Sequence, residues 1–159
     1  MNTKLHFSSE NDSWETPPEV FEPLNDEFEF TLDVCATKAN AKCDDWIGKG
    51  DTRLWSGRCF MNPPYGRQIK TWVHHAALSV QDTDTTMYGN PELVCCLLPA
   101  RTDTRWWHDY IWDATKHRPR PGVEVRFLKG RIKFVGAKHA APFPSAIVIF
   151  HRGAFAVAR

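Results

Sequence analysis

The apolar run Leu93–Leu98 constrains the fold of this chain most strongly, because it contains no polar position and ends at Pro99. Strands that are buried on both faces, as in the centre of a parallel sheet, have this uninterrupted pattern. A second apolar run, Cys59–Met61, is followed by a proline turn and then by residues with helical spacing. Both runs predict an α/β fold with parallel strands at its centre.

The spacing of apolar residues along the rest of the chain predicts an alternation of helices and strands. Helices are expected over about 17–24, 68–80 and 107–114, and strands over 28–34, 59–61, 93–98, 123–128, 131–135 and 145–151. Thr16 would cap the first helix, in a capping box with Glu19. Lys129-Gly130 would join the two strands that flank it as a hairpin. We expect a three-layer mixed sheet with a parallel centre and an antiparallel edge hairpin, in one domain over 1–159 whose residues 1–11 form a loose arm.

The turn Asn62-Pro63-Pro64-Tyr65 carries the clearest chemical signal. Each proline fixes its own φ and restricts the residue before it, so the turn holds its hydrogen-bond acceptors in set directions. The Asn62 side-chain oxygen and the Pro63 backbone oxygen can accept the two hydrogens of an –NH2 group, while the Tyr65 ring stacks on a flat heterocycle. This pattern predicts a site for the amine of a base. A plain strand-to-helix turn is the alternative interpretation.

The net charge of +1 hides an asymmetry between the two parts of the chain. Residues 1–100 carry 8 Lys and Arg against 15 Asp and Glu, a balance of −7, whereas residues 101–159 carry 12 against 4, a balance of +8. A basic C-terminal part is typical of a phosphate-binding surface, although a solvated face has the same pattern. The candidate phosphate contacts are Arg101, Arg118, Arg120, Lys129, Arg131 and Lys133.

Cysteine and histidine usage argues against a metal site. The five cysteines form an odd set without a C-x-x-C pair, and the seven histidines are scattered, so we expect free buried thiols, no zinc and a reducing cytoplasm. No apolar run approaches the ~18 residues of a membrane helix, and Met1–Lys4 does not begin a signal peptide.

Five blocks of sequence, taken in order, resemble the phage-type DNA N6-adenine methyltransferases. The likeness covers about residues 12–151. The blocks are Trp14-Glu15-Thr16-Pro17, Leu32-Asp33-Val34-Cys35-Ala36, Asn62-Pro63-Pro64-Tyr65-Gly66, Leu98-Pro99-Ala100-Arg101-Thr102-Asp103-Thr104 and Phe127-Leu128-Lys129-Gly130-Arg131.

The resemblance implies a Rossmann-like methyltransferase fold, S-adenosylmethionine as methyl donor, and a flipped-out adenine in double-stranded DNA as acceptor, in the bacterial host cytoplasm if a phage encodes the chain. Asn62, Pro63, Pro64 and Tyr65 would be catalytic, and the basic residues named above would contact DNA. The residues expected to bind the cofactor are Trp14, Thr16, Pro17, Asp33, Cys35, Asp51 and Asn62.

Two departures from the wider methyltransferase pattern bear on this prediction. The residues directly after Asp33, 34–47, contain no G-x-G, and only 26 residues separate Cys35 from Asn62, which leaves no room there for a separate target-recognition domain. Asp33 can also be read as a cap of the turn that follows it. An RNA base or a protein glutamine as acceptor, and a catalytically inactive nucleic-acid binder, stay open as alternatives. The sequence leaves the DNA recognition site, the number of strands modified and the oligomeric state open.

Overall fold

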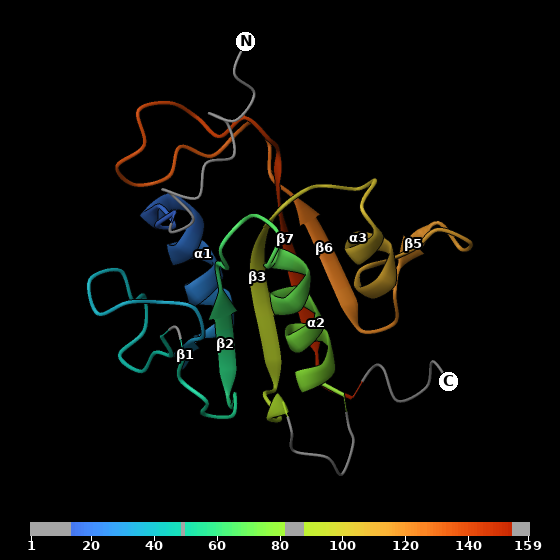
Figure 1. The fold of residues 1–159 in the computed structure, drawn as a ribbon, viewed down its shortest axis with the longest axis horizontal. Helices are drawn as coiled ribbons and strands as arrows, with labels where there is room; N and C mark the ends of the chain where they lie inside the picture. The colour runs from blue at the N-terminus through green and yellow to red at the C-terminus, as the bar shows by residue number, and fades with distance from the viewer. Residues whose placement is uncertain (1–13, 49, 82–87, 154–159) are drawn as a thin grey trace.

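The protein was analysed as a computed structural model, which describes residues 14–48, 50–81 and 88–153. A mixed five-stranded sheet organises it (Figure 1). The strands in spatial order are β1 (Leu32–Asp33), β2 (Arg58–Met61), β3 (Leu93–Pro99), β7 (Ser145–His151) and β6 (Val123–Phe127). The first three are parallel to one another, and β7 is antiparallel to both of its neighbours. The predicted α/β class with parallel central strands is confirmed.

Helices pack against this sheet. Phe21 of α1 (Pro18–Phe28) contacts Phe60 of β2 edge-on, with ring centroids 5.0 Å apart. The side chains of Cys59 and Met61 point to the opposite face, because side chains alternate along a strand. The helices α2 (Ile69–Ser79) and α3 (Arg105–Tyr110) contact each other, and Figure 1 shows α2 over the middle of the sheet.

The carboxyl ends of the parallel strands form the functional edge of the sheet, from which four connections leave. The parallel strands β1, β2 and β3 end at this edge, where ligands bind in open α/β sheets. Because β7 runs antiparallel between β3 and β6, β6 ends there as well, with Phe127 paired to Ala146. The connections 34–57, 62–68, 100–104 and 128–144 therefore all leave the sheet at the same edge.

The N-terminal elements differ from the prediction. Helix α1 begins one residue late, with Pro17 as N-cap and no side-chain cap bond among the described residues, so the Thr16 capping box is wrong. The helix then runs on to Phe28 and ends where Glu29 adopts a left-handed conformation (φ 51°) and donates its N–H to Asn25. The predicted strand 28–34 therefore shrinks to β1.

The predicted hairpin at Lys129-Gly130 is wrong. β6 pairs with β7 over its whole length, and 131–135 forms no sheet strand within the described part of the chain; Val135 alone bridges to Glu15. The alternation there is real, because Ile132 and Phe134 are buried, but it packs a connecting loop against the core. The antiparallel hairpin of this protein lies elsewhere, between β4 (Trp112–Asp113) and β5 (Arg118–Pro119).

That small hairpin also shortens the third predicted helix, since α3 ends at Tyr110 instead of continuing to about 114.

The predicted loose arm, residues 1–11, lies outside the described residues. Within the described ranges, every helix is too short or too polar to cross a bilayer.

Candidate active site

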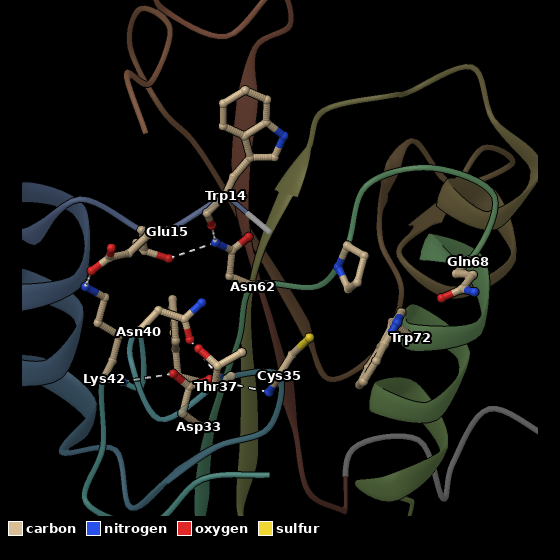
Figure 2. A pocket seen from close by; sticks show the side chains of 14 residues that line it. Trp14, Glu15, Asp33, Cys35, Thr37, Asn40, Lys42, Asn62, Gln68 and Trp72 are labelled. Atoms are coloured by element: carbon tan, nitrogen blue, oxygen red, sulfur yellow. Dashed lines mark hydrogen bonds and ion pairs between the residues drawn. The ribbon is translucent and has the colours of Figure 1, made fainter. Parts of the chain in front are cut away.

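A pocket of about 340 Å³ opens beyond the carboxyl ends of β1 and β2. Figure 2 shows Glu15, Asn40 and Lys42 on one side of it, Gln68 and Trp72 on the other, and Asn62 between them. Its lining residues are Trp14, Glu15, Thr16, Asp33, Cys35, Ala36, Thr37, Asn40, Lys42, Phe60, Asn62, Pro64, Gln68 and Trp72. The volume lies at the lower end of the 300–1,000 Å³ that small-molecule sites occupy.

Asn62 lies directly after β2 with its amide held on one side only. Its Nδ2 group donates to the backbone carbonyl of Trp14 and, over 3.0 Å, to the hydroxyl of Thr16. Its Oδ1 atom is buried and finds no hydrogen-bond partner among the described residues. A carbonyl can only accept, so the Trp14 contact fixes which end of the amide carries the nitrogen. Asn62 therefore lines the pocket and carries a buried, unpaired acceptor.

Asp33 is the buried carboxylate of the pocket, with 3 % of its surface exposed. Burial raises its pKa to about 6, although the backbone N–H groups of Lys42 and Cys35 bind the carboxylate and act in the opposite direction. Both N–H groups come from the chain that follows β1, so the loop wraps around the carboxylate as a turn cap would. Asp33 also lines the pocket, so its role as a turn cap leaves the predicted contact with a cofactor geometrically possible, and that contact stays a prediction.

Other polar groups of the pocket come from the irregular segment after β1 and from the residues before α1. The ammonium of Lys42 forms a salt bridge with Glu15 over 2.9 Å, and both residues line the pocket. Burial raises the pKa of the Cys35 thiol to about 12, which keeps it neutral and unreactive. The pocket thus offers charges of both signs.

Tyr65 does not line the pocket. Its ring is 8 % exposed and packs edge-on against Phe134 and Phe143 of the 128–144 connection, with centroid distances of 6.1 and 5.4 Å. Its hydroxyl donates to the backbone carbonyl of Leu97 over 3.1 Å, and burial raises its pKa. Pro63 is buried too, and Pro64 is the proline of the turn that faces the pocket.

The residues expected to bind a cofactor separate into two groups. Trp14, Thr16, Asp33, Cys35 and Asn62 come together in the pocket lining. Two others lie outside it: Pro17 is the N-cap of α1, and Asp51 binds the backbone N–H and the guanidinium of Arg53.

The predicted phosphate contacts also separate. Arg101 follows β3 at the functional edge, with its guanidinium carbon 5.9 Å from the centre of the Phe143 ring. Lys129 and Arg131 are exposed on the 128–144 connection at the same edge. Arg118 is exposed on the β4–β5 hairpin, which Figure 1 shows to the side of the sheet.

Arg120 binds the protein backbone. Its guanidinium donates twice to the backbone carbonyl of His108, at 2.9 and 2.7 Å. These bonds connect the end of the β4–β5 hairpin to α3, so the Arg120 guanidinium stabilises the fold in this structure.

Sequence reasoning did not identify Glu15, Asn40, Lys42, Gln68 or Trp72 as pocket residues. The Trp72 ring stacks on that of Trp55, with centroids 6.4 Å apart, and Trp72 also lines the pocket. Helical spacing could have flagged Gln68 and Trp72, which stand one turn apart at the start of α2. The irregular segment that holds Asn40 and Lys42 offers no such signal.

In the described part of the chain, no cluster of three or more His, Cys, Asp or Glu side chains could hold a metal ion. The pocket lining itself contains amide, carboxylate, ammonium, hydroxyl, thiol and aromatic side chains.

Comparison with known proteins adds one finding. A family model described as DNA N-6-adenine-methyltransferase (Dam) matches residues 3–152, nearly the whole chain. No curated protein matches the chain.

Proposed function

The chain belongs to the DNA N-6-adenine-methyltransferase (Dam) family, and we propose that it transfers a methyl group from S-adenosylmethionine to the N6 amine of an adenine flipped out of double-stranded DNA. The family match supports DNA adenine methylation. The donor, the flipping of the base, the Rossmann-like assignment of the fold and the roles of individual residues are parts of the proposal.

The unpaired Oδ1 of Asn62 carries this proposal. A buried acceptor without a partner costs about 1–3 kcal/mol, and a donor from a ligand in the adjoining pocket would offset that cost. An exocyclic amine is such a donor. The Trp14 carbonyl and Thr16 hydroxyl already hold the nitrogen end of the amide, which leaves the oxygen for the ligand.

The remaining pocket groups fit the proposed cofactor. S-adenosylmethionine, when bound, supplies a methyl group activated by a sulfonium, and it carries an ammonium, a carboxylate, ribose hydroxyls and an adenine ring. Asp33 can accept from a hydroxyl or an ammonium group, and the Glu15–Lys42 pair offers both signs of charge to an amino acid. Trp72 adds an aromatic ring to the opposite wall.

The chain's own residues would activate the amine by accepting hydrogen bonds from its two N–H groups. The N6 lone pair is delocalised into the adenine ring, which makes the nitrogen a poor nucleophile. Asn62 Oδ1, with the Pro63 carbonyl, would favour a tetrahedral nitrogen and stabilise the positive charge that develops on it. The extra proton can then leave to solvent, so no strong base is needed.

Stacking of the extruded base on Tyr65 requires a movement. Phe134 and Phe143 cover the ring edge-on in this structure, and both belong to the 128–144 connection. Flipping a base costs a few kcal/mol, which stacking partly offsets. We propose that the connection shifts when DNA binds and that the base replaces one of the two phenylalanine rings.

The same connection is the proposed DNA-contacting segment. It leaves the functional edge and carries exposed Lys129 and Arg131, which would neutralise phosphates close to the pocket. Arg118 lies on the separate hairpin, and Arg120 is bound to the backbone there. We therefore rank Lys129 and Arg131 above the two hairpin arginines as phosphate contacts.

Nucleoside mass analysis of DNA from cells that express the chain tests this function. We expect N6-methyladenine with the wild type and background levels with Asn62→Ala. A folded Asn62→Ala protein that still binds S-adenosylmethionine in calorimetry shows that the variant lost chemistry and not structure. Methylated RNA or protein glutamine without N6-methyladenine would contradict the proposed acceptor. Failure of the wild-type protein to bind S-adenosylmethionine would favour an inactive nucleic-acid binder.

A further inference from the structure

The hydroxyl of Thr16 contacts the catalytic turn and not the helix that follows it. Helix α1 takes Pro17 as its N-cap, and within the described residues no side chain caps it. Thr16 is 2 % exposed, and its Oγ1 accepts a hydrogen bond from Nδ2 of Asn62 over 3.0 Å. Forty-six positions separate the two residues. The hydroxyl of this buried threonine therefore has one specific partner, an amide that is distant in sequence.

Two hydrogen-bond partners hold the Asn62 amide, and the Trp14 carbonyl selects its orientation, because a carbonyl can only accept whereas a hydroxyl can also donate. One hydrogen of Nδ2 goes to the Trp14 carbonyl and the other to the Thr16 hydroxyl. A rotation of the amide by 180° would place Oδ1 against the Trp14 carbonyl, where two acceptors repel each other. The torsion that turns an asparagine amide is otherwise broad, so these contacts hold the amide in one orientation.

We propose that Thr16 is a positioning residue that holds the Asn62 amide with Oδ1 available to the amine of the target base. This inference rests on the proposed function. Without the hydroxyl, one N–H of Nδ2 loses its partner and the amide gains freedom to turn. The oxygen is then correctly placed for a smaller fraction of the time, and the amine loses its acceptor for the remainder.

Steady-state kinetics distinguishes this role from cofactor binding. Thr16→Val keeps the shape but removes the hydroxyl, and we expect kcat to fall about tenfold, the equivalent of one neutral hydrogen bond. Thr16→Ser keeps the hydroxyl and should restore kcat to near the wild-type value. Thr71→Val, an exposed position of α2 outside the pocket, is the matched control. A rise in the cofactor dissociation constant with kcat unchanged at saturation would overturn the proposal.

A second measurement needs neither cofactor nor DNA. The side-chain NH2 signals of Asn62 can be identified in a nitrogen-15 spectrum by their disappearance in Asn62→Ala. We expect slow exchange of these hydrogens with water in the wild type and in Thr16→Ser, and faster exchange in Thr16→Val. Equal exchange in Thr16→Val and wild type would refute the contact, whatever the activity shows.

The two experiments separate failure of this inference from failure of the proposed function. If Asn62→Ala methylates DNA as well as the wild type, the proposed function fails. If Asn62→Ala is inactive but Thr16→Val behaves as the wild type in both kcat and exchange, the function stands and the positioning role of Thr16 is wrong.

Discussion

The buried carboxylate of Asp33 makes a quantitative prediction for the pH dependence of stability. Its pKa is about 6 in the folded protein against 3.8 for an exposed aspartate, and burial is the main cause. At full effect this difference corresponds to about 3 kcal/mol.

The sign follows from which state binds the proton more tightly. Because the folded state has the higher pKa, it holds the proton between about pH 4 and pH 6 while the unfolded chain has released it. The contribution of Asp33 to the free energy of unfolding is therefore greatest below about pH 4. It is lost as the pH rises through 6.

Urea unfolding of the cofactor-free protein between pH 4 and pH 8 measures this effect. Asp33→Asn cannot titrate at this position, so the wild-type curve minus the variant curve isolates the Asp33 contribution from those of other groups. We expect that difference to fall by about 2.5 kcal/mol across the range, because an exposed aspartate is already partly ionised at pH 4. Parallel curves, or a difference that rises with pH, would refute the assignment of Asp33 as a carboxylate destabilised by burial.

Three further predictions follow from particular contacts. Replacing Lys129 and Arg131 with Gln should reduce the slope of log affinity for DNA against log salt by about two units, and an unchanged slope would exclude both residues as phosphate contacts. Tyr65→Phe should lower the free energy of unfolding by about 0.5–1.5 kcal/mol, because it removes the buried hydrogen bond to the Leu97 carbonyl, yet keep methyl transfer within a few-fold of wild type. A large loss of turnover in a folded variant would show that the hydroxyl itself takes part in the reaction. Gly89→Ala should destabilise far more than Gly130→Ala in thermal unfolding. Both glycines have positive φ, but only at Gly89 would the added carbon meet backbone, 2.3 Å from the Trp55 oxygen, so equal losses would contradict the close approach.

The sequence predicted the centre of the fold because local pattern and burial agree there. The run ending at Pro99 is fully buried in β3, and the proline turn joins β2 to α2 as expected. Five of the predicted residues line the pocket. Position at a strand end was enough to predict Asp33, Cys35 and Asn62, whereas Trp14 and Thr16 were predicted from the family resemblance.

The errors arose where a local pattern admits two tertiary outcomes. The alternation at 131–135 fits a strand, yet β7 takes the place beside β6, and Ile132 and Phe134 pack as a loop instead. Thr16 fits a capping box, but Asn62 binds its hydroxyl. Partners distant in sequence decide both cases.

The central claim is that Asn62 Oδ1 accepts a hydrogen bond from the target amine. A crystal structure with DNA and a non-reactive analogue of S-adenosylmethionine tests it most directly. The DNA should contain the site identified by mapping N6-methyladenine. We predict the flipped adenine with its N6 within about 2.7–3.2 Å of Asn62 Oδ1. An adenine bound elsewhere, or an Asn62 oxygen paired with a protein group in that complex, would contradict the account.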